Sequence, residues 1–184
     1  MLKPNVVAPD RARIETLEFG PGSWVPNSRL PVVLIRGALD GPSDDGDIHA
    51  LYRANGWGGT WTWTVYDFHH YHSTAHEALA VATGQAILML GGPEGREVTV
   101  RAGDLVVLPV GTGHKRLDAS GDFAVCGAYP AGQEPDLLKV TEENWRAAEA
   151  RIAAVPLPRT DPFYGAEGPL ARPWQRGDGG AGAG

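Results

Sequence analysis

The sequence predicts an all-β fold built from many short strands. Its 184 residues include 25 glycines and 15 prolines, and these residue types mark turns more often than helix interiors. Short apolar segments recur at roughly regular spacing between the turns, which is typical of a β-sandwich or barrel. We expect a single domain over residues 1–176 with its metal-binding core over residues 60–130, and a disordered Gly/Ala tail over residues 177–184.

Seven segments have strand character. They alternate apolar and polar side chains or are rich in β-branched and aromatic residues, and turn residues separate them. The glycine-rich segment at residues 91–95 links two of them as a hairpin and is not a phosphate-binding loop, because no helix with a Lys-Ser/Thr pair follows it. The expected strands span residues 14–19, 31–36, 61–66, 86–90, 97–101, 105–108 and 122–129.

Two helices are expected, one on each side of the strand-rich region. The first begins at an acidic cap around Asp44 and ends at Asn55-Gly56. The second begins at Thr141 and ends before Pro156, and apolar residues recur along one of its faces. The segment at residues 159–174 carries three aromatic side chains, so we expect it to pack on the body of the protein.

The composition excludes several classes of protein. The 16 Lys and Arg residues against 22 Asp and Glu residues give a net charge of −6, which predicts no nucleic-acid partner and no anionic membrane surface as partner. A lone cysteine, Cys126, excludes a disulfide framework and is expected as a small buried hydrophobe. The apolar runs are too short to cross a bilayer and the first residues form no secretory signal, so we expect a cytoplasmic location.

Four of the six histidines lie within eight residues of one another. On a strand, His70 and His72 project to the same face about 6–7 Å apart, whereas His69 faces the other way. Glu77 returns a carboxylate after a turn, and His114 follows a loop that can aim it from a neighbouring strand. Three imidazoles and one carboxylate suit a divalent transition metal, with Fe²⁺ favoured and Zn²⁺, Mn²⁺, Ni²⁺ or Cu²⁺ as alternatives.

Two segments resemble the two motifs of the cupin superfamily. Residues 70–84 follow the pattern His-x-His-x4-Glu-x6-Gly, and residues 103–118 follow the pattern Gly-x5-Pro-x-Gly-x2-His-x3-Asp, with Asp118 where asparagine is usual. Thr64 stands where the leading glycine of the first motif would fall, which leaves the ligand positions unchanged. The resemblance implies a jelly-roll β-barrel, often dimeric, with a metal held by His70, His72, Glu77 and His114.

The flanking segments resemble a narrower group, the YjlB-like bacterial cupins. This resemblance spans nearly the whole chain and implies a short helix before the first motif and a C-terminal helix plus an extended tail. It implies no particular reaction, because likeness of fold names no substrate. The segments that carry it are residues 26–27, 30–31, 55–59, 69–73, 111–114, 127–130 and 161–165.

Other polar side chains near the motifs have two interpretations each. Arg116 and Asp118 share strand parity with His114, so Arg116 can hold a substrate carboxylate and Asp118 can act as a base. The competing interpretation of this pair is an internal ion pair or an exposed strand end. His76 is either a replacement metal ligand or a hydrogen-bond partner beside the site.

Four aromatic residues precede the histidine cluster. Tyr66 and Phe68 share parity with His70, so they line the pocket or pack in the core. Trp61 and Trp63 share a face with each other, and we interpret them as packing under the helix or at a dimer contact.

The preferred hypothesis is a metal-dependent cupin enzyme, namely a mononuclear non-heme iron dioxygenase that acts on a small polar organic molecule. A redox-neutral isomerase, decarboxylase or lyase is the first alternative, with Asp118 or a metal-bound hydroxide as the base. A non-catalytic cupin that binds a small molecule is the second, and a cavity mouth plugged by the C-terminal segment would favour it. We also expect a homodimer, because the edges of a jelly roll need cover.

Overall fold

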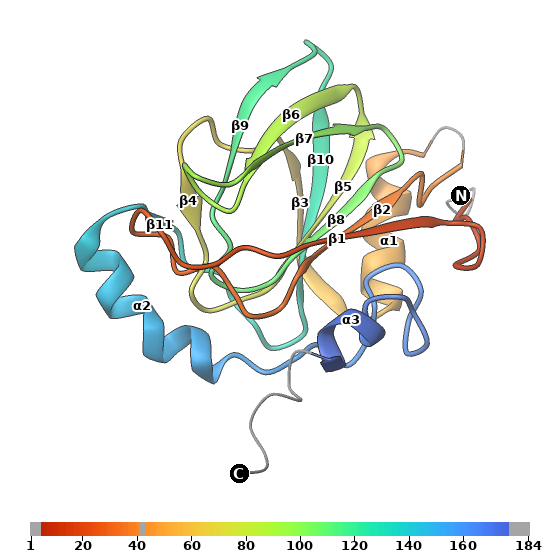
Figure 1. Cartoon of the computed structure of the whole chain (residues 1–184). Helices are drawn as coiled ribbons and strands as arrows, with labels where there is room; N and C mark the ends of the chain where they lie inside the picture. Colours follow the sequence, from red (N-terminus) through yellow and green to blue (C-terminus); the bar gives the residue numbers. More distant parts are fainter. Residues whose placement is uncertain (1–4, 41–42, 177–184) are drawn as a thin grey trace.

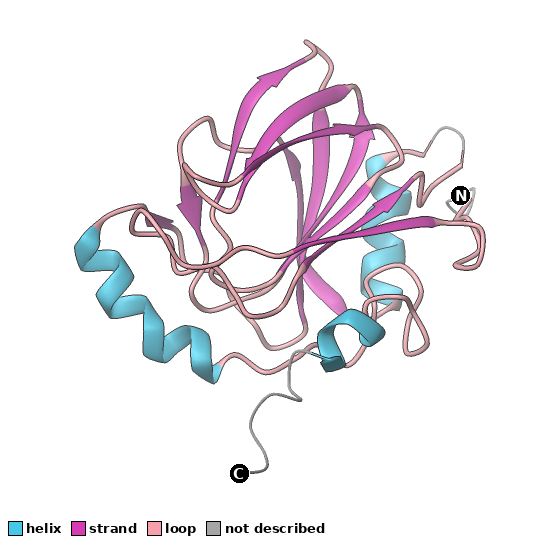
Figure 2. Cartoon of the chain, viewed as in Figure 1, coloured by secondary structure: helices cyan, strands magenta, loops and turns pink. Residues whose placement is uncertain are grey.

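Two antiparallel sheets form the body of the protein, with three helices around them (Figures 1 and 2). The structure is a computed structural model that describes residues 5–40 and 43–176. The first sheet runs in the order β1 (Arg13–Leu17), β2 (Val32–Arg36), β8 (Leu105–Leu108), β5 (Glu77–Thr83), β10 (Ala124–Pro130) and β3 (Trp57–Trp63). The second runs in the order β11 (Leu138–Lys139), β4 (His70–Tyr71), β9 (His114–Ala119), β6 (Gln85–Leu90) and β7 (Arg96–Arg101).

The two sheets confirm the all-β jelly-roll fold expected for a cupin. One detail of the expectation is wrong, because the sheets do not close into a barrel. Within residues 5–40 and 43–176, no strand of one sheet pairs with a strand of the other. Strand β4 is only two residues long and meets β9 through the single pair His70↔His114, and its other edge pairs with β11.

The core has two layers, which explains why several strands are apolar throughout. In β2, Val32 and Leu34 face the space between the sheets, whereas Val33 and Ile35 face outward beneath a layer of helix and tail. Because side chains alternate along a strand and both faces are covered, all four are buried. The outer face of the second sheet has no such cover over β7, where exposed and buried residues alternate.

Helix α1 (Asp45–Ala54) covers the outer face of the first sheet and starts as the sequence predicts. The side chain of Asp44 accepts a hydrogen bond from the backbone N–H of Asp47 over 2.8 Å, which caps the first turn. The C-terminal segment extends this layer, since Phe163 packs on Tyr52 of the helix with ring centroids 5.4 Å apart. The last element, α3 (Ala171–Arg176), places Trp174 in the same cluster, and its indole N–H donates to the carbonyl of Pro31 over 2.9 Å.

Helix α2 (Glu142–Ala154) lies on the opposite side of the sheets from α1 (Figure 1). It begins after Thr141, whose side chain accepts from the backbone N–H of Asn144 over 3.2 Å. Among the helices of the described residues, none has the length and apolar character needed to cross a membrane. The Gly/Ala tail expected at residues 177–184 lies outside the described residues.

Strand β5 was not expected from the sequence, although it carries part of the site. Its alanine-rich sequence has low strand propensity, but it lies between β8 and β10 with both faces covered. The small side chains of Ala78 and Ala80 face the helical layer, and Leu79 and Val81 face the second sheet. Tertiary packing therefore decides a strand that local preference does not indicate.

Candidate metal centre

The alternation of β5 directs the carboxylate of Glu77 into the space between the sheets. Glu77 shares parity with Leu79 and Val81, which both pack in the inter-sheet core. It pairs with Leu108 of β8 and is 3% exposed. A buried carboxylate at the start of a central strand is costly unless cationic or hydrogen-bonding partners surround it.

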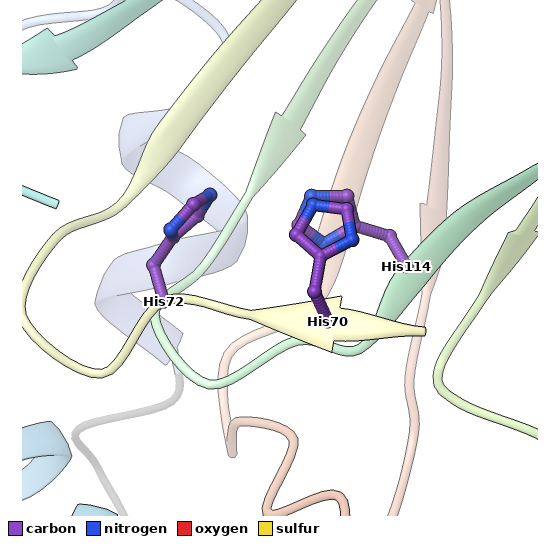
Figure 3. A group of neighbouring side chains, drawn as sticks. All are labelled: His70, His72 and His114. Carbon is purple, nitrogen blue, oxygen red and sulfur yellow. The ribbon is translucent and has the colours of Figure 1, made fainter. Parts of the chain in front are cut away.

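Three histidines, one each from β4, β9 and the loop after β4, meet beside this carboxylate. His70 pairs directly with His114 across β4 and β9, and their ring centroids are 4.1 Å apart. Figure 3 shows that the ring of His72, in the loop after β4, projects to the same side as the ring of His70. One nitrogen from each of the three imidazoles lies within 4.8 Å of the others, which forms a group that can hold a metal ion.

Backbone carbonyls fix the orientation of all three imidazoles. Nδ1 of His70 lies 3.0 Å from the carbonyl of Phe68, and Nδ1 of His114 lies 2.9 Å from the carbonyl of Thr112. Nδ1 of His72 makes the same kind of contact with the carbonyl of Asp136. Because a carbonyl can only accept, each Nδ1 carries a proton and donates it, and each Nε2 is the nitrogen left to bind a ligand.

The carboxylate of Glu77 lies beside two of these imidazoles. Its Oε2 lies 3.3 Å from Nε2 of His72 and 3.3 Å from Nε2 of His114. This oxygen is buried and has no hydrogen-bond partner, whereas Oε1 accepts a hydrogen bond from the hydroxyl of Tyr129 over 3.1 Å. Three nitrogen donors and an unsatisfied buried carboxylate oxygen fit a divalent transition-metal ion.

Burial and the close approach of the imidazoles and the carboxylate shift the pKa values of His70, His72 and Glu77. Burial lowers the pKa of His70 to about 3, with the neighbouring His114 acting in the same direction, which keeps this imidazole neutral. Burial also opposes charge on His72, but the carboxylate of Glu77 outweighs it and raises the pKa of His72 to about 9. Although burial acts against ionisation, His72 and His114 hold the pKa of Glu77 well below its usual range. The buried carboxylate thus demands a positive charge at this point.

His76 is turned away from the group, although it precedes Glu77 in the chain. Its Nδ1 accepts from the backbone N–H of Val110 over 3.0 Å, and its Nε2 lies 3.2 Å from the carbonyl of Pro156. Its ring packs on Trp174 with centroids 4.8 Å apart. Both nitrogens are occupied, so of the two interpretations of His76 the structure supports hydrogen bonding to the backbone and not ligation.

The structure places Asp118 outside the cavity, contrary to the parity argument. Arg116 pairs with Leu88, but the next pairing of β9 with β6 joins Asp118 to Ile87, so Leu117 is an extra residue in a β-bulge. A one-residue shift exchanges the two faces of a strand, and Asp118 therefore lies exposed on the outer face.

Arg116 makes hydrogen bonds to backbone carbonyls, whereas the sequence suggested that it could hold a substrate carboxylate. Its Nε donates to the carbonyl of Val65 over 3.1 Å, and its backbone N–H donates to the carbonyl of Tyr66 over 2.8 Å. These bonds attach β9 to the segment that follows β3. Arg116 does not line the cavity described next.

A cavity of about 350 Å³ opens beside the histidines and Glu77. Its walls are mainly apolar and aromatic. Tyr66 lines the cavity, which agrees with one of its two interpretations. Trp61 and Trp63 also line the cavity, although one interpretation placed them under α1. The lining residues are Trp61, Trp63, Thr64, Val65, Tyr66, His70, His72, Glu77, Leu79, His114, Tyr129, Pro135, Asp136 and Leu137.

Sequence reasoning assigned no role to Tyr129 or to Asp136. The signal for Tyr129 was present in β10, because Val125, Gly127 and Tyr129 alternate on the face directed toward the second sheet and the cavity. Asp136 had no comparable signal. It lies in a loop, and only the tertiary structure brings its carbonyl to His72.

Comparisons with known proteins were made for both the sequence and the structure. No protein-family profile matches the chain. Among solved structures, acireductone dioxygenase from Bacillus anthracis is 15% identical, with a TM-score of 0.35 over 50% of this chain and 62% of that chain. A single-residue variant of oxalate decarboxylase from Bacillus subtilis is 16% identical, with a TM-score of 0.37 over 63% of this chain and 29% of that chain. The chain thus spans less than two thirds of either protein, and these low scores carry no argument about activity.

A curated relative gives a much stronger match. The uncharacterized protein YjlB of Bacillus subtilis (strain 168) is 35% identical over 161 residues, which cover 87% of this chain and 96% of the relative. Identity at this level over nearly the full length of both chains agrees with the jelly-roll fold and with the histidines placed by both motifs. The chain belongs to the same family as YjlB.

Proposed function

We propose that this protein is a metal-dependent cupin enzyme, and specifically a mononuclear non-heme iron dioxygenase that acts on a small organic molecule. His70, His72, Glu77 and His114 would hold the metal. The observation that supports this proposal most is Oε2 of Glu77, which is buried without a hydrogen-bond partner and lies 3.3 Å from two imidazole nitrogens. An Fe²⁺ ion at this position would supply the redox chemistry that no protein side chain offers.

The residues of the chain would bind and orient the reactants. The three backbone carbonyls would orient each imidazole with its Nε2 toward the metal, and Tyr129 would hold Glu77 by its Oε1. The aromatic and aliphatic walls of the cavity would exclude bulk water from the reacting molecule. These are the tasks that an oxidation in a confined site requires of the protein.

The position of Asp118 weighs against the form of the redox-neutral alternative in which Asp118 is the base, and it leaves a metal-bound hydroxide as the base unaffected. An isomerase, decarboxylase or lyase in which Asp118 removes a proton needs this carboxylate beside the substrate, but Asp118 lies on the outer face of β9. The buried Tyr129 does not replace it, because burial and the nearby Glu77 raise the pKa of this phenol and disfavour its use as a base.

The path of the C-terminal segment weighs against the non-catalytic alternative. A plug in the cavity mouth would favour a binding protein. Phe163, Leu170 and Trp174 pack instead in the cluster on the outer face of the first sheet, and none of them lines the cavity. The cavity therefore stays accessible to a small molecule.

Metal analysis of the purified protein tests the first part of the proposal. We expect about one equivalent of iron per chain in protein purified without added metal, and loss of that metal in the His114→Gln variant. The matched control is His49→Gln, since His49 on α1 contacts only the exposed Thr62 over 3.0 Å. Full metal occupancy in His114→Gln would contradict the proposed ligand set.

Oxygen consumption tests the second part. Protein loaded anaerobically with Fe²⁺ is mixed with a panel of small molecules and then with air-saturated buffer, and an oxygen electrode records uptake. We expect uptake with at least one class of compound and none with the Zn²⁺-loaded protein. Zinc, manganese or nickel as the native metal, with no uptake by the iron form, would favour redox-neutral chemistry instead.

Two further expectations from the sequence stay predictions. We propose a homodimer because β1 and β7 are sheet edges without a partner strand among the described residues. A monomer in light scattering at micromolar concentration would contradict the proposed homodimer. The cytoplasmic location is tested by fractionating the cells that produce the protein.

A further inference from the structure

The walls of the cavity are aromatic and aliphatic from its mouth to the histidines. Trp63 and Leu137 line it and are 55% and 46% exposed, which places them where solvent enters. Tyr66 stands edge-on to Trp63 with ring centroids 5.1 Å apart, and edge-on to His70 with ring centroids 5.2 Å apart. A ligand bound here lies against apolar surface over most of its length.

Both carboxylates of the cavity wall already have partners. Asp136 accepts hydrogen bonds from the backbone N–H of Ser73 over 2.6 Å and from its hydroxyl over 2.5 Å. Glu77 lies against two imidazoles and Tyr129. Because Oε2 of Glu77 is assigned to the proposed metal, neither carboxylate is left to pair with a positive charge on a ligand.

The cavity also offers nothing to pair with a distant negative charge. Among the residues that the structure describes, no lysine or arginine lines it. Arg116 is the cation that the sequence indicated for this purpose, but it is not among the lining residues, and its Nε donates to the backbone carbonyl of Val65. Among the described lining residues, the place for a negative charge is therefore the end of the cavity at the three histidines.

From these contacts we infer that the ligand is a small molecule with oxygen donors at one end and an uncharged, apolar body. The inference rests on the proposed function, because it assigns the oxygen end to the metal. A charge on the body would lie against the buried Val65 and Leu79 without a partner, which is unfavourable. The sequence favoured a small polar molecule, and the lining restricts the polarity to one end.

Two probes of the same size test this inference. 4-Methylcatechol and 3,4-dihydroxybenzoate share a pair of adjacent hydroxyls and differ at the opposite end, which is a methyl group in one and a carboxylate in the other. Calorimetry measures their binding to the full chain loaded with Zn²⁺, which does not oxidise them. We expect 4-methylcatechol to bind at least tenfold more tightly, and equal or reversed affinities would overturn the inference.

Two lysine variants locate the effect in the cavity. Leu137→Lys places a cation in the lining, and we expect it to tighten binding of 3,4-dihydroxybenzoate at least threefold without tightening that of 4-methylcatechol. Leu117→Lys is the matched control, because Leu117 is similarly exposed at 41% but lies outside the lining. An equal gain in affinity for 3,4-dihydroxybenzoate in both variants would overturn the inference, since general electrostatic attraction between the protein and the probe would then explain the gain.

The affinity for Zn²⁺ alone is measured first and separates the two proposals. Failure to bind metal would reject the proposed function. Normal metal binding together with tighter binding of the charged probe would reject only the inferred class of ligand.

Discussion

The hydroxyl of Tyr129 donates a hydrogen bond to Oε1 of Glu77 over 3.1 Å and accepts one from Nε1 of Trp61 over 2.9 Å. The phenol therefore links the wall of the cavity to the carboxylate at the metal site. Burial and the nearby Glu77 raise the pKa of Tyr129, so the hydroxyl keeps its proton and remains a donor. With Oε1 fixed in this way, Oε2 is turned toward His72 and His114.

Tyr129→Phe should weaken metal binding while the fold is kept. The variant removes the donor to Glu77 and frees the carboxylate to rotate, and the loss of such a supporting contact lowers metal affinity about 10–100-fold. Calorimetric titration with Zn²⁺ or Co²⁺ checks the value. Tyr164→Phe is the control, because this tyrosine lies in the C-terminal segment and its hydroxyl makes no hydrogen bond. An affinity of Tyr129→Phe equal to that of the wild type would refute the supporting role.

Asp118→Asn should leave metal affinity and any oxygen uptake unchanged within twofold. The β-bulge at Leu117 turns Asp118 to the outer face of β9, where its charge is solvated. Glu77→Gln is the comparison variant, since it removes the charge from the buried carboxylate, and we expect it to lose metal almost completely. A large loss of activity in Asp118→Asn alone would restore this residue as a candidate base.

Gly127→Ala should destabilise the protein and distort the cavity wall. A Cβ at Gly127 would lie 2.1 Å from the indole of Trp61, so the ring or the strand would have to move. Overpacking of this kind costs about 1–3 kcal/mol, which predicts a fall in the thermal midpoint of roughly 2–12 °C for a chain of this length.

Gly58→Ala is the matched control for this change. Gly58 also lies in a strand of the first sheet, but a Cβ there would meet nothing within 4 Å. Differential scanning calorimetry of both variants checks the prediction. Equal midpoints for Gly127→Ala and Gly58→Ala would show that Trp61 is not held against the strand.

Cys126 should resist alkylation in the folded protein. Burial raises the pKa of its thiol to about 11, so only about one thiol in a thousand is ionised at pH 8. Mass spectrometry after iodoacetamide treatment at pH 8 should find modification only after unfolding. Rapid labelling of the folded chain would contradict this expectation.

The same thiol should make stability fall at alkaline pH. The pKa of Cys126 is raised from 9.0 in the unfolded chain to about 11, so the unfolded chain loses the proton first. The contribution to stability is complete below pH 9 and is lost as the pH rises to 11. Urea titrations of the wild type and Cys126→Ala should converge over this range, and parallel curves would argue against it.

Local sequence signals were sufficient for the parts of the fold that depend on short-range structure. The caps at Asp44 and Thr141 and the hairpin between β6 and β7 require only neighbouring residues, and each was predicted close to its observed position. Strand β5 and helix α3 were not predicted. Their sequences have weak or mixed preferences, and contacts with distant segments decide their conformation.

The sequence by itself determined which donors are available and in what order. Their spacing matches two cupin motifs, and the donors are His70, His72, Glu77 and His114. The alternation of side chains sets the face on which each strand residue lies. Only the tertiary structure decided what surrounds them. A single bulged residue at Leu117 moves Asp118 to the outer face, and pairing of β10 with β3 brings Trp61 and Tyr129 to the cavity. Such effects depend on register between strands far apart in the chain, which no local pattern encodes.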